Sequence, residues 1–561
     1  MDAHPVVTGD RWRVHTSPGG TLYTVHGPAP VDVAALTRWL QLSCEGPVPV
    51  RQGFVAVLVR PDGRLVAAAS NRLEVTAYWS FERGRPVLAA HLQDLIRALD
   101  VPPALDIDKL ADLMVLHDDG ATTAFVGVNR LPVGHRLKWS PGAREPRVER
   151  WFRPLDEEPL RVAMEDAPGL MRETVRDAVA ASLPASGDVA GTLSGGLDSS
   201  MVLGTAARLL HPEGRTVHAL TSVPLPGAVE PRKGWIVSDG PDAERMCREV
   251  PGLTWTGIAN DDRVLSLDIL EPTFERTWHP VLNPSNTIWI TQLVRRGEGF
   301  GTPLMLTGAT GNGPFSRDRA GVVRTLLRQR RLGPLLSEPR RRRAATGQPW
   351  GRIARDLAGE TVLSRPWRRA RVSPFAASMP VLADRMDERR QTSLTRFDRF
   401  RDPQQSWVDL VTRDASMGLA AQDLSDAVWW SDPLCDPEVV RLALRLPPET
   451  WLHGGMARGL AREAARGVVP DHIRLRHTRG AQSADVGLVL PARRQAYRDA
   501  LDLLRASHSA CQFIDLDALG RAVEHDFPGE DHDARTWQVA QDRAFGYGLF
   551  AAWYETRVLR G

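Results

Sequence analysis

Residues 189–200, VAGTLSGGLDSS, decide the fold of this chain. The apolar first half predicts a short buried strand, and the apolar-faced run over 201–210 predicts a helix. Gly195 and Gly196 therefore lie at a strand-to-helix turn, where glycine permits close backbone approach and the helix N-terminus favours an anion. The turn predicts a loop that binds pyrophosphate, and an ordinary glycine-rich turn is the alternative.

The polar side chains of this turn add a cation to the prediction. Ser194 and Ser199 offer hydroxyl donors to phosphate, whereas Asp198 would repel phosphate unless a cation stood between them. A carboxylate among phosphate donors is typical of Mg²⁺, which uses one or two carboxylates together with phosphate oxygens. The loop lacks the lysine of G-x-x-x-x-G-K-[ST] and does not match G-x-G-x-x-G.

Length and composition predict a soluble protein of two or more domains. The chain has 561 residues, of which 42% are hydrophobic and 25% charged. No apolar run approaches a membrane span and the N-terminus lacks a signal-peptide pattern, so we expect a cytoplasmic protein with no membrane association. A net charge of +3 does not favour nucleic acid, and four scattered cysteines favour neither zinc nor a disulfide framework.

The pattern along the chain changes near residue 150. Before it the chain is β-rich, with a hairpin of strands at 53–59 and 65–69, another strand at 136–139 and a linker over 141–159. After it strands alternate with helices, which favours a doubly wound parallel sheet with ligands at the carboxyl ends of its strands. The expected segments are helices at 167–182 and 243–249, and strands at 189–193, 217–222 and 303–308.

Residues 194–200 match the pyrophosphate loop of the asparagine synthetase superfamily, and the chain resembles asparagine synthetase B-type enzymes over nearly its whole length. The resemblance implies an α/β protein that uses ATP and Mg²⁺. Residues 1–150 would form a β-rich, Ntn-hydrolase-like domain of the glutaminase type. Residues 160–561 would form an ATP-dependent synthetase domain of the adenine nucleotide α-hydrolase-like (PP-loop) type, with a parallel sheet and a helical C-terminal part.

The resemblance breaks at the glutaminase nucleophile. That family needs a cysteine directly after the initiator methionine, and this chain has Asp2 there and its first cysteine at Cys44. Because a carboxylate cannot perform thiolate chemistry, we expect no glutamine hydrolysis. The attacking amine must then come from the substrate, as it does in β-lactam synthetase-like enzymes and in lasso peptide cyclases.

Several stretches resemble the lasso peptide (isopeptide bond-forming) macrolactam cyclases most. They are TGATGN at 307–312, NPSN at 283–286 with Trp289, RGLAR at 458–462, and RHTRGAQ at 476–482 with Asp485. The resemblance implies a ribosomally made precursor peptide as substrate, with a leader-binding protein and a leader peptidase as partners. A side-chain carboxylate of Asp or Glu would be adenylated, and the N-terminal amine of the peptide would then close the ring.

Three positions depart from the synthetase pattern. Asn312 stands where synthetases place a second magnesium-binding aspartate, Thr478 where they have a catalytic lysine, and Trp429 where they have a glutamate. Arg479 adjoins Thr478 and can stabilise an anion, but a permanently protonated guanidinium cannot shuttle protons. The sequence therefore names no general base for the incoming amine.

The candidate site residues follow from the loop and the resemblance. We expect catalytic roles for Asp198, Arg476 and Arg479, although an arginine in so arginine-rich a chain has an alternative role in a surface ion pair. Asp198 and Asn312 are the expected metal ligands. The expected nucleotide-binding residues are Leu193, Ser194, Gly195, Gly196, Asp198, Ser199, Ser200, Ser222, Gly308 and Asn312.

Two other functions and one other surface stay open. A β-lactam synthetase-like enzyme would act on a small molecule, and a pseudo-synthetase would bind ATP and a partner without chemistry, as the missing lysine and glutamate suggest. The arginine-rich segment 328–371 is either a solvated helical face or a docking surface for an acidic partner.

Overall fold

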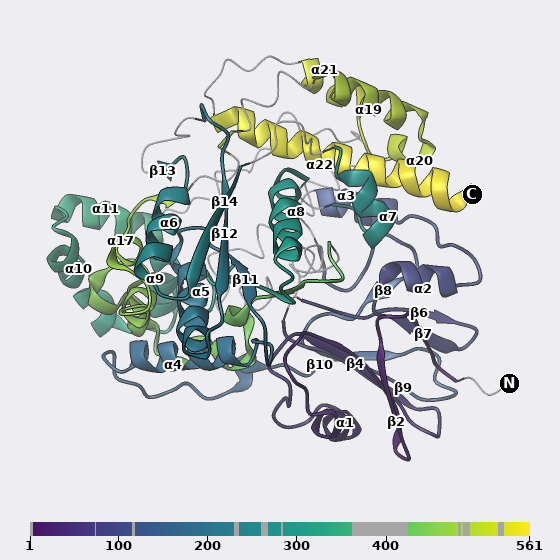
Figure 1. Ribbon diagram of the computed structural model, residues 1–561, viewed down its shortest axis with the longest axis horizontal. Helices are drawn as coiled ribbons and strands as arrows, with labels where there is room; N and C mark the ends of the chain where they lie inside the picture. The colour runs from purple at the N-terminus through teal and green to yellow at the C-terminus, as the bar shows by residue number, and fades with distance from the viewer. Residues whose placement is uncertain are drawn as a thin grey trace.

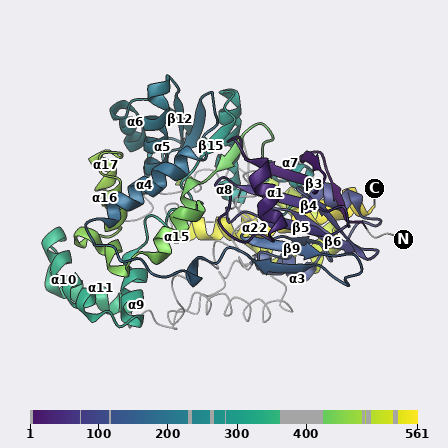
Figure 2. The same cartoon turned by 90° about the horizontal axis from the view of Figure 1, so that it is seen from below.

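The computed structural model describes residues 4–72, 74–114, 118–228, 235–259, 267–281, 284–361, 424–480, 484–485, 494–524 and 532–560. Figure 1 shows the β-rich N-terminal part beside a parallel sheet flanked by helices, with the last long helix, α22 (His532–Tyr554), running along the top. Figure 2 gives the view from below, in which α10 (Leu332–Thr346) and α11 (Trp350–Thr361) lie at the edge farthest from the N-terminus.

The N-terminal part contains two sheets packed face to face. Alternation along β4 places Val55 and Val57 in the core between the sheets, and Phe54, Ala56 and Leu58 under α1 (Val33–Gln41). The six-stranded antiparallel sheet has the order β10 (Arg147–Arg150), β9 (His135–Trp139), β5 (Leu65–Ala69), β4 (Phe54–Val59), β3 (Gly20–His26) and β2 (Arg13–Ser17). The second sheet has the order β1 (Val6–Thr8), β7 (Arg85–Ala89), β6 (Tyr78–Glu82) and β8 (Asn129–Arg130).

The predicted hairpin is confirmed, since β4 and β5 pair antiparallel. The predicted linker over 141–159 is wrong in part, because β10 falls inside it and pairs with β9. Its residues Arg147 to Arg150 are half-buried or exposed, so no apolar alternation marked the strand. The N-terminal part also contains the helices α2 (Leu92–Ala98) and α3 (Ile107–Met114).

A five-stranded, entirely parallel sheet organises the rest of the chain, as predicted. Its order is β14 (Leu253–Ala259), β12 (Val217–Val223), β11 (Val189–Thr192), β15 (Leu304–Leu306) and β16 (Trp429–Ser431). One face packs against α4 (Ala167–Ala180), α5 (Leu197–Leu210) and α6 (Gly240–Glu249), and the other against α8 (Pro284–Gly299). The sheet is therefore covered on both sides, which is typical of parallel sheets.

Two edge strands, β14 and β16, were missing from the prediction. The C-terminal helices pack on the four-stranded N-terminal sheet, since Phe545 and Tyr554 of α22 share a core with Tyr78 and Val87. Among the described residues, one short pair of parallel strands joins β13 (Trp235–Ile236) to β17 (Arg479–Gly480). The α-helices not yet named are α7 (Leu270–Thr277), α9 (Arg319–Arg328), α15 (Pro437–Arg445), α16 (Gly459–Ala464), α17 (Asp471–Arg474), α19 (Arg494–Ala506), α20 (His508–Cys511) and α21 (Leu516–Glu524). Among the described residues, no helix combines the length and apolar composition needed to cross a bilayer.

Candidate nucleotide site

The predicted loop joins β11 to the N-terminus of α5. Gly195 adopts a left-handed φ of +61°, which glycine takes without strain, and Gly196 is the N-cap of the helix. The loop is closed by Ser199, whose Oγ accepts a hydrogen bond from Ser194 N at 3.2 Å and lies 3.0 Å from Ser194 Oγ. This geometry presents the positive end of a 14-residue helix at the edge of the sheet.

A cavity of about 280 Å³ opens at this edge. It is bounded by the carboxyl ends of β11, β12 and β15, which is where open α/β sheets generally bind their ligands. The predicted residues that line it are Leu193, Ser194, Gly196, Asp198, Ser199, Ser222, Gly308 and Asn312. The structure therefore brings together most of the predicted nucleotide-binding set.

Two predicted members of this set do not line the cavity. Ser200 is fully buried, because one step along the helix from Ser199 turns its side chain toward the core. Gly195 is absent from the cavity lining, and a Cβ placed on it would stand 3.1 Å from Asp239 Oδ1. Gly195 thus shapes the turn and does not contribute to the lining.

Asp198 has the environment of a cation ligand. Its Oδ2 accepts a hydrogen bond from Ser316 Oγ at 3.0 Å, whereas Oδ1 is buried and has no hydrogen-bond partner among the described residues. Burial raises the pKa of Asp198 to about 6, and the Ser316 hydroxyl and the charge of Arg458 offset only part of that rise. Asp198 lines the cavity, and its unpartnered carboxylate oxygen fits one ligand to Mg²⁺. No cluster of three or more His, Cys, Asp or Glu side chains suited to a metal occurs in the described part of the chain.

The 307–312 loop packs directly on Asp198. A Cβ on Gly308 would stand 2.7 Å from the backbone of Asp198 and Ser199, and one on Gly311 would stand 2.4 Å from Asp198 Oδ1. Real Cβ atoms do not approach other atoms so closely, so both positions require glycine. The loop glycines of TGATGN therefore serve the fit between the loop and the carboxylate.

Asn312 has an arginine as its neighbour. Its Oδ1 accepts a hydrogen bond from Arg458 Nη2 at 3.1 Å. Arg458 caps α16 in a left-handed conformation with a φ of +57°, which is costly for a residue with a side chain and is found most often at functional sites. The sequence motif at 458–462 carried no assigned role, and the charge of its first residue lowers the pKa of Asp198.

Asp432 anchors the loop from the far side. Thr310 N and Thr310 Oγ1 each donate to Asp432 Oδ2 at 2.8 Å, and Leu434 N donates to Oδ1 at 3.0 Å. Burial raises the pKa of Asp432 to about 6. Sequence reasoning missed this residue, because its partner Thr310 lies more than a hundred residues earlier in the chain.

Arg476 is not among the residues that line the cavity, and its catalytic role stays a prediction. Its Nη1 forms ion pairs with Asp239 and Asp242, both at 2.8 Å, behind the Gly195 turn. The pairing of β13 with β17 brings these segments together. Asp239 lines the cavity, and its pKa is raised because burial outweighs the nearby guanidinium. The ion pairs of Arg476 are the kind of contact that the sequence offered as its alternative role.

The other departures supply no base. Trp429 Nε1 donates to Glu74 Oε2 at 3.1 Å, and Thr478 is exposed. The backbone of Arg479 pairs with Trp235, and its side chain lies outside the described part of the structure. The acidic residues that do line the cavity are Asp198, Asp239 and Asp485.

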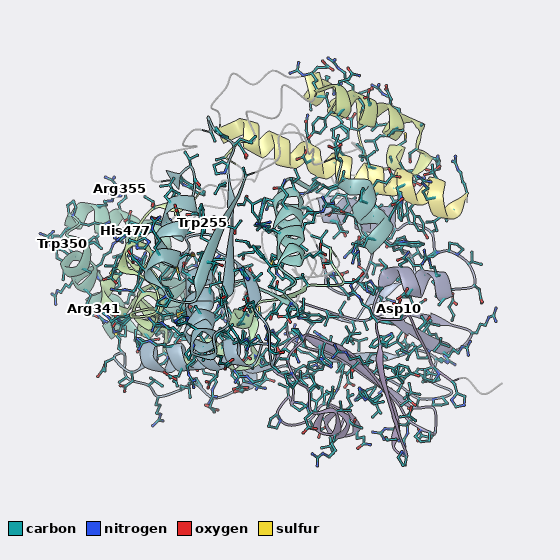
Figure 3. All side chains as sticks on the ribbon, viewed as in Figure 1. Asp10, Trp255, Arg341, Trp350, Arg355 and His477 are labelled. Atoms are coloured by element: carbon teal, nitrogen blue, oxygen red, sulfur yellow. The ribbon has the colours of Figure 1, made fainter. Side chains whose placement is uncertain are left out.

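The arginine-rich segment lies away from the cavity. Figure 3 shows Arg341, Trp350 and Arg355 on the outer helices α10 and α11. Arg341 donates to Ser337 and to the sulfur of Met164, and Arg343 lies over the Trp350 ring at 5.1 Å. These contacts fit a solvated face, while the predicted arginines at 365–371 fall outside the described residues.

Two comparisons with known proteins bear on this site. A sequence model of the family described as asparagine synthase matches residues 170–555, which is more than half of the chain and includes the whole parallel sheet. No curated protein sequence matches the chain significantly.

Proposed function

The chain belongs to the asparagine synthase family of ATP-dependent amide-forming domains, and we propose that this member closes a macrolactam ring in a ribosomally made lasso precursor peptide. One observation carries the proposal: Asp198 lines the cavity beside the pyrophosphate loop and keeps a buried oxygen without a hydrogen-bond partner among the described residues. We infer that this carboxylate binds the cation of a metal–triphosphate complex at the carboxyl edge of the parallel sheet.

The first step activates the acid. An Asp or Glu side-chain carboxylate of the peptide attacks the α-phosphorus of ATP, the bond from that phosphorus to the bridging oxygen breaks, and pyrophosphate leaves. Ser194, Ser199 and the N-terminus of α5 bind the departing pyrophosphate. Mg²⁺, when bound by Asp198, neutralises charge on the phosphates. Arg458, held beside Asp198 by Asn312, supplies a further fixed cation at this end of the cavity.

The second step forms the amide. The N-terminal amine of the peptide attacks the acyl carbon of the adenylate, AMP leaves with the electron pair of the broken C–O bond, and one proton is released. Asp239 and Asp485 are the other two carboxylates on the cavity wall. Trp289 and Leu293 of α8 form an apolar side of the cavity. An apolar wall helps the site to keep water away from the reactive adenylate.

The finer assignments are parts of the same proposal. Residues 1–150 are a degenerate Ntn-hydrolase-like domain without glutaminase activity, and residues 160–561 are the synthetase domain of the PP-loop type. A leader-binding protein and a leader peptidase deliver the peptide and expose its amine. Two cyclase-like motifs support the assignment to cyclases. The 307–312 motif packs on Asp198, and the 458–462 motif contacts Asn312 of that loop.

ATP–pyrophosphate exchange tests this proposal. Exchange that depends on a precursor peptide bearing an acid several residues after its N-terminus is the expected result. Exchange stimulated by a small amino acid derivative, and not by the peptide, would instead assign a β-lactam synthetase-like function. Retained ATP binding with no exchange under either condition would identify a pseudo-synthetase that serves as a scaffold for a partner.

A further inference from the structure

Glu74 lies where the N-terminal part meets the parallel sheet, and its side chain is almost fully buried. Its two oxygens accept hydrogen bonds from five donors on both sides of the boundary. Oε2 accepts from Gly53 N at 2.8 Å and Trp429 Nε1 at 3.1 Å, and Oε1 accepts from Arg72 Nε at 2.8 Å, Ser431 Oγ at 3.0 Å and Asp432 N at 3.0 Å. Three of these donors belong to β16 and the residue that follows it.

Arg72 completes the cluster and is itself fully buried. Its guanidinium donates to Ser431 Oγ at 2.8 Å, to Ser182 Oγ at 3.2 and 3.3 Å, and to the Arg51 carbonyl at 2.8 Å. Replacing either charged member of this cluster should be strongly destabilising, because the buried charge left behind would have neither a partner nor water to compensate it. The N-terminal part therefore contributes two buried charged side chains to the boundary with β16, an edge strand of the parallel sheet.

This cluster leads to the nucleotide site through two hydrogen-bonded steps. Glu74 holds the backbone N–H of Asp432, and the carboxylate of Asp432 holds the N–H and hydroxyl of Thr310. Thr310 lies between Gly308 and Gly311, which pack on Asp198 at distances that allow no Cβ. Because that packing tolerates only small displacements, the position of Asp432 determines how the loop sits on Asp198.

We propose that Glu74 is a positioning residue for the 307–312 loop, so that the N-terminal part sets the geometry of the metal-binding carboxylate without performing chemistry itself. The proposal rests on the function proposed above for Asp198. It gives residues 4–150 a structural role at the nucleotide site that needs no glutaminase chemistry.

Hydrogen exchange of backbone amides in the ligand-free full chain tests this directly. In Glu74→Gln, a near-isosteric change that weakens the acceptor toward Asp432 N and Arg72, we expect amides of 307–316 to exchange about tenfold faster. Arg51→Ala is the matched control. It removes a bidentate ion pair with Asp436, at 2.9 and 3.0 Å, that joins the same two parts of the chain. Within the described residues, the Arg51 side chain forms no hydrogen bond to the 307–312 loop. There the loop should exchange as in the wild type.

A second readout follows metal and nucleotide binding. The measured quantity is the Mg²⁺ concentration that gives half of the thermal stabilisation by ATP. It should rise about tenfold in Glu74→Gln and in Thr310→Val. It should stay unchanged in Arg51→Ala and in Thr310→Ser, since serine keeps the hydroxyl. If Glu74→Gln fails to fold, Ser431→Ala breaks one bond to the same carboxylate and takes its place.

Equal loop exchange in Glu74→Gln and Arg51→Ala would overturn the positioning role, since the effect would then be general loosening of the boundary. So would unchanged exchange in Glu74→Gln and Ser431→Ala. A wild-type chain that shows no ATP–pyrophosphate exchange would contradict the proposed function, while the amide exchange comparison would still decide the role of Glu74.

Discussion

Gly311 and Asp198 are packed so closely that a Cβ on Gly311 would stand 2.4 Å from the buried, unpartnered Oδ1 of Asp198. The space that a methyl group would occupy is the space beside the oxygen on which the proposed metal would bind. The identity of residue 311 is therefore tied to the chemistry of residue 198, across more than a hundred residues of sequence.

Gly311→Ala should reduce ATP–pyrophosphate exchange by about a hundredfold, because the added methyl must displace the loop or the carboxylate by a substantial fraction of an ångström. Gly333→Ala, in the open surroundings of α10, is the matched control and should leave exchange unchanged. Circular dichroism should show a native fold for both. An active Gly311→Ala enzyme would mean that the loop does not fix Asp198.

Asp198→Asn should stabilise the ligand-free protein near pH 7.5 while abolishing exchange. Burial raises the pKa of Asp198 to about 6, so the folded state binds more protons than the unfolded state between about pH 4 and 6, and stability falls as pH rises through that window. Removing the charge should add about 1 to 2 kcal/mol at pH 7.5. Urea unfolding from pH 4 to 8 measures this. A variant equally stable at pH 4, less stable at pH 7.5 and still active would contradict the environment assigned to Asp198.

Arg458→Ala should lower exchange by about ten- to a hundredfold, because it removes the cation that Asn312 holds beside Asp198. Arg458→Gly should lose as much activity but gain stability, since glycine takes the positive φ without strain. Arg340→Ala, on the exposed face of α10, is the control. Measured exchange rates and melting temperatures of the three variants check both halves of this prediction. Full activity in Arg458→Ala would show that the guanidinium does not contact phosphate.

Arg476→Lys should lower stability more than it lowers exchange, because the structure gives Arg476 a bracing role between Asp239 and Asp242. Lysine keeps one charge but cannot reach two carboxylates with the same geometry. The melting temperature and the exchange rate of the variant, measured together, separate the two effects. A large loss of exchange at unchanged melting temperature would restore the catalytic role predicted from the sequence.

The strand, turn and helix at residues 189–210 could be predicted from sequence because every signal there is local. Apolar runs, paired glycines and a helix start all lie within one short window. The helix is confirmed, although α5 begins at Leu197, four residues before the predicted run over 201–210. The parallel sheet followed from the same logic at each strand with its own apolar run. β16 could not be predicted, since its three residues become a strand only by pairing with β15, about 120 residues earlier.

The cavity-lining residues on the loop were also predictable, but their supports were not. Glu74 sits in an unremarkable polar stretch, and only folding buries it among donors from β16. Arg476 looked free to meet phosphate, because a sequence shows a charge without showing the two acids that neutralise it. Non-local contacts of this kind carry the geometry of the site, and one sequence contains no local record of them.

Product analysis decides whether the chain transfers AMP from ATP to a peptide carboxylate before the ring closes. With ATP, Mg²⁺ and a precursor peptide whose N-terminal amine is exposed, we expect one AMP and one pyrophosphate per ring, with a peptide product lighter by one water. Release of ADP and orthophosphate with the same peptide would contradict it.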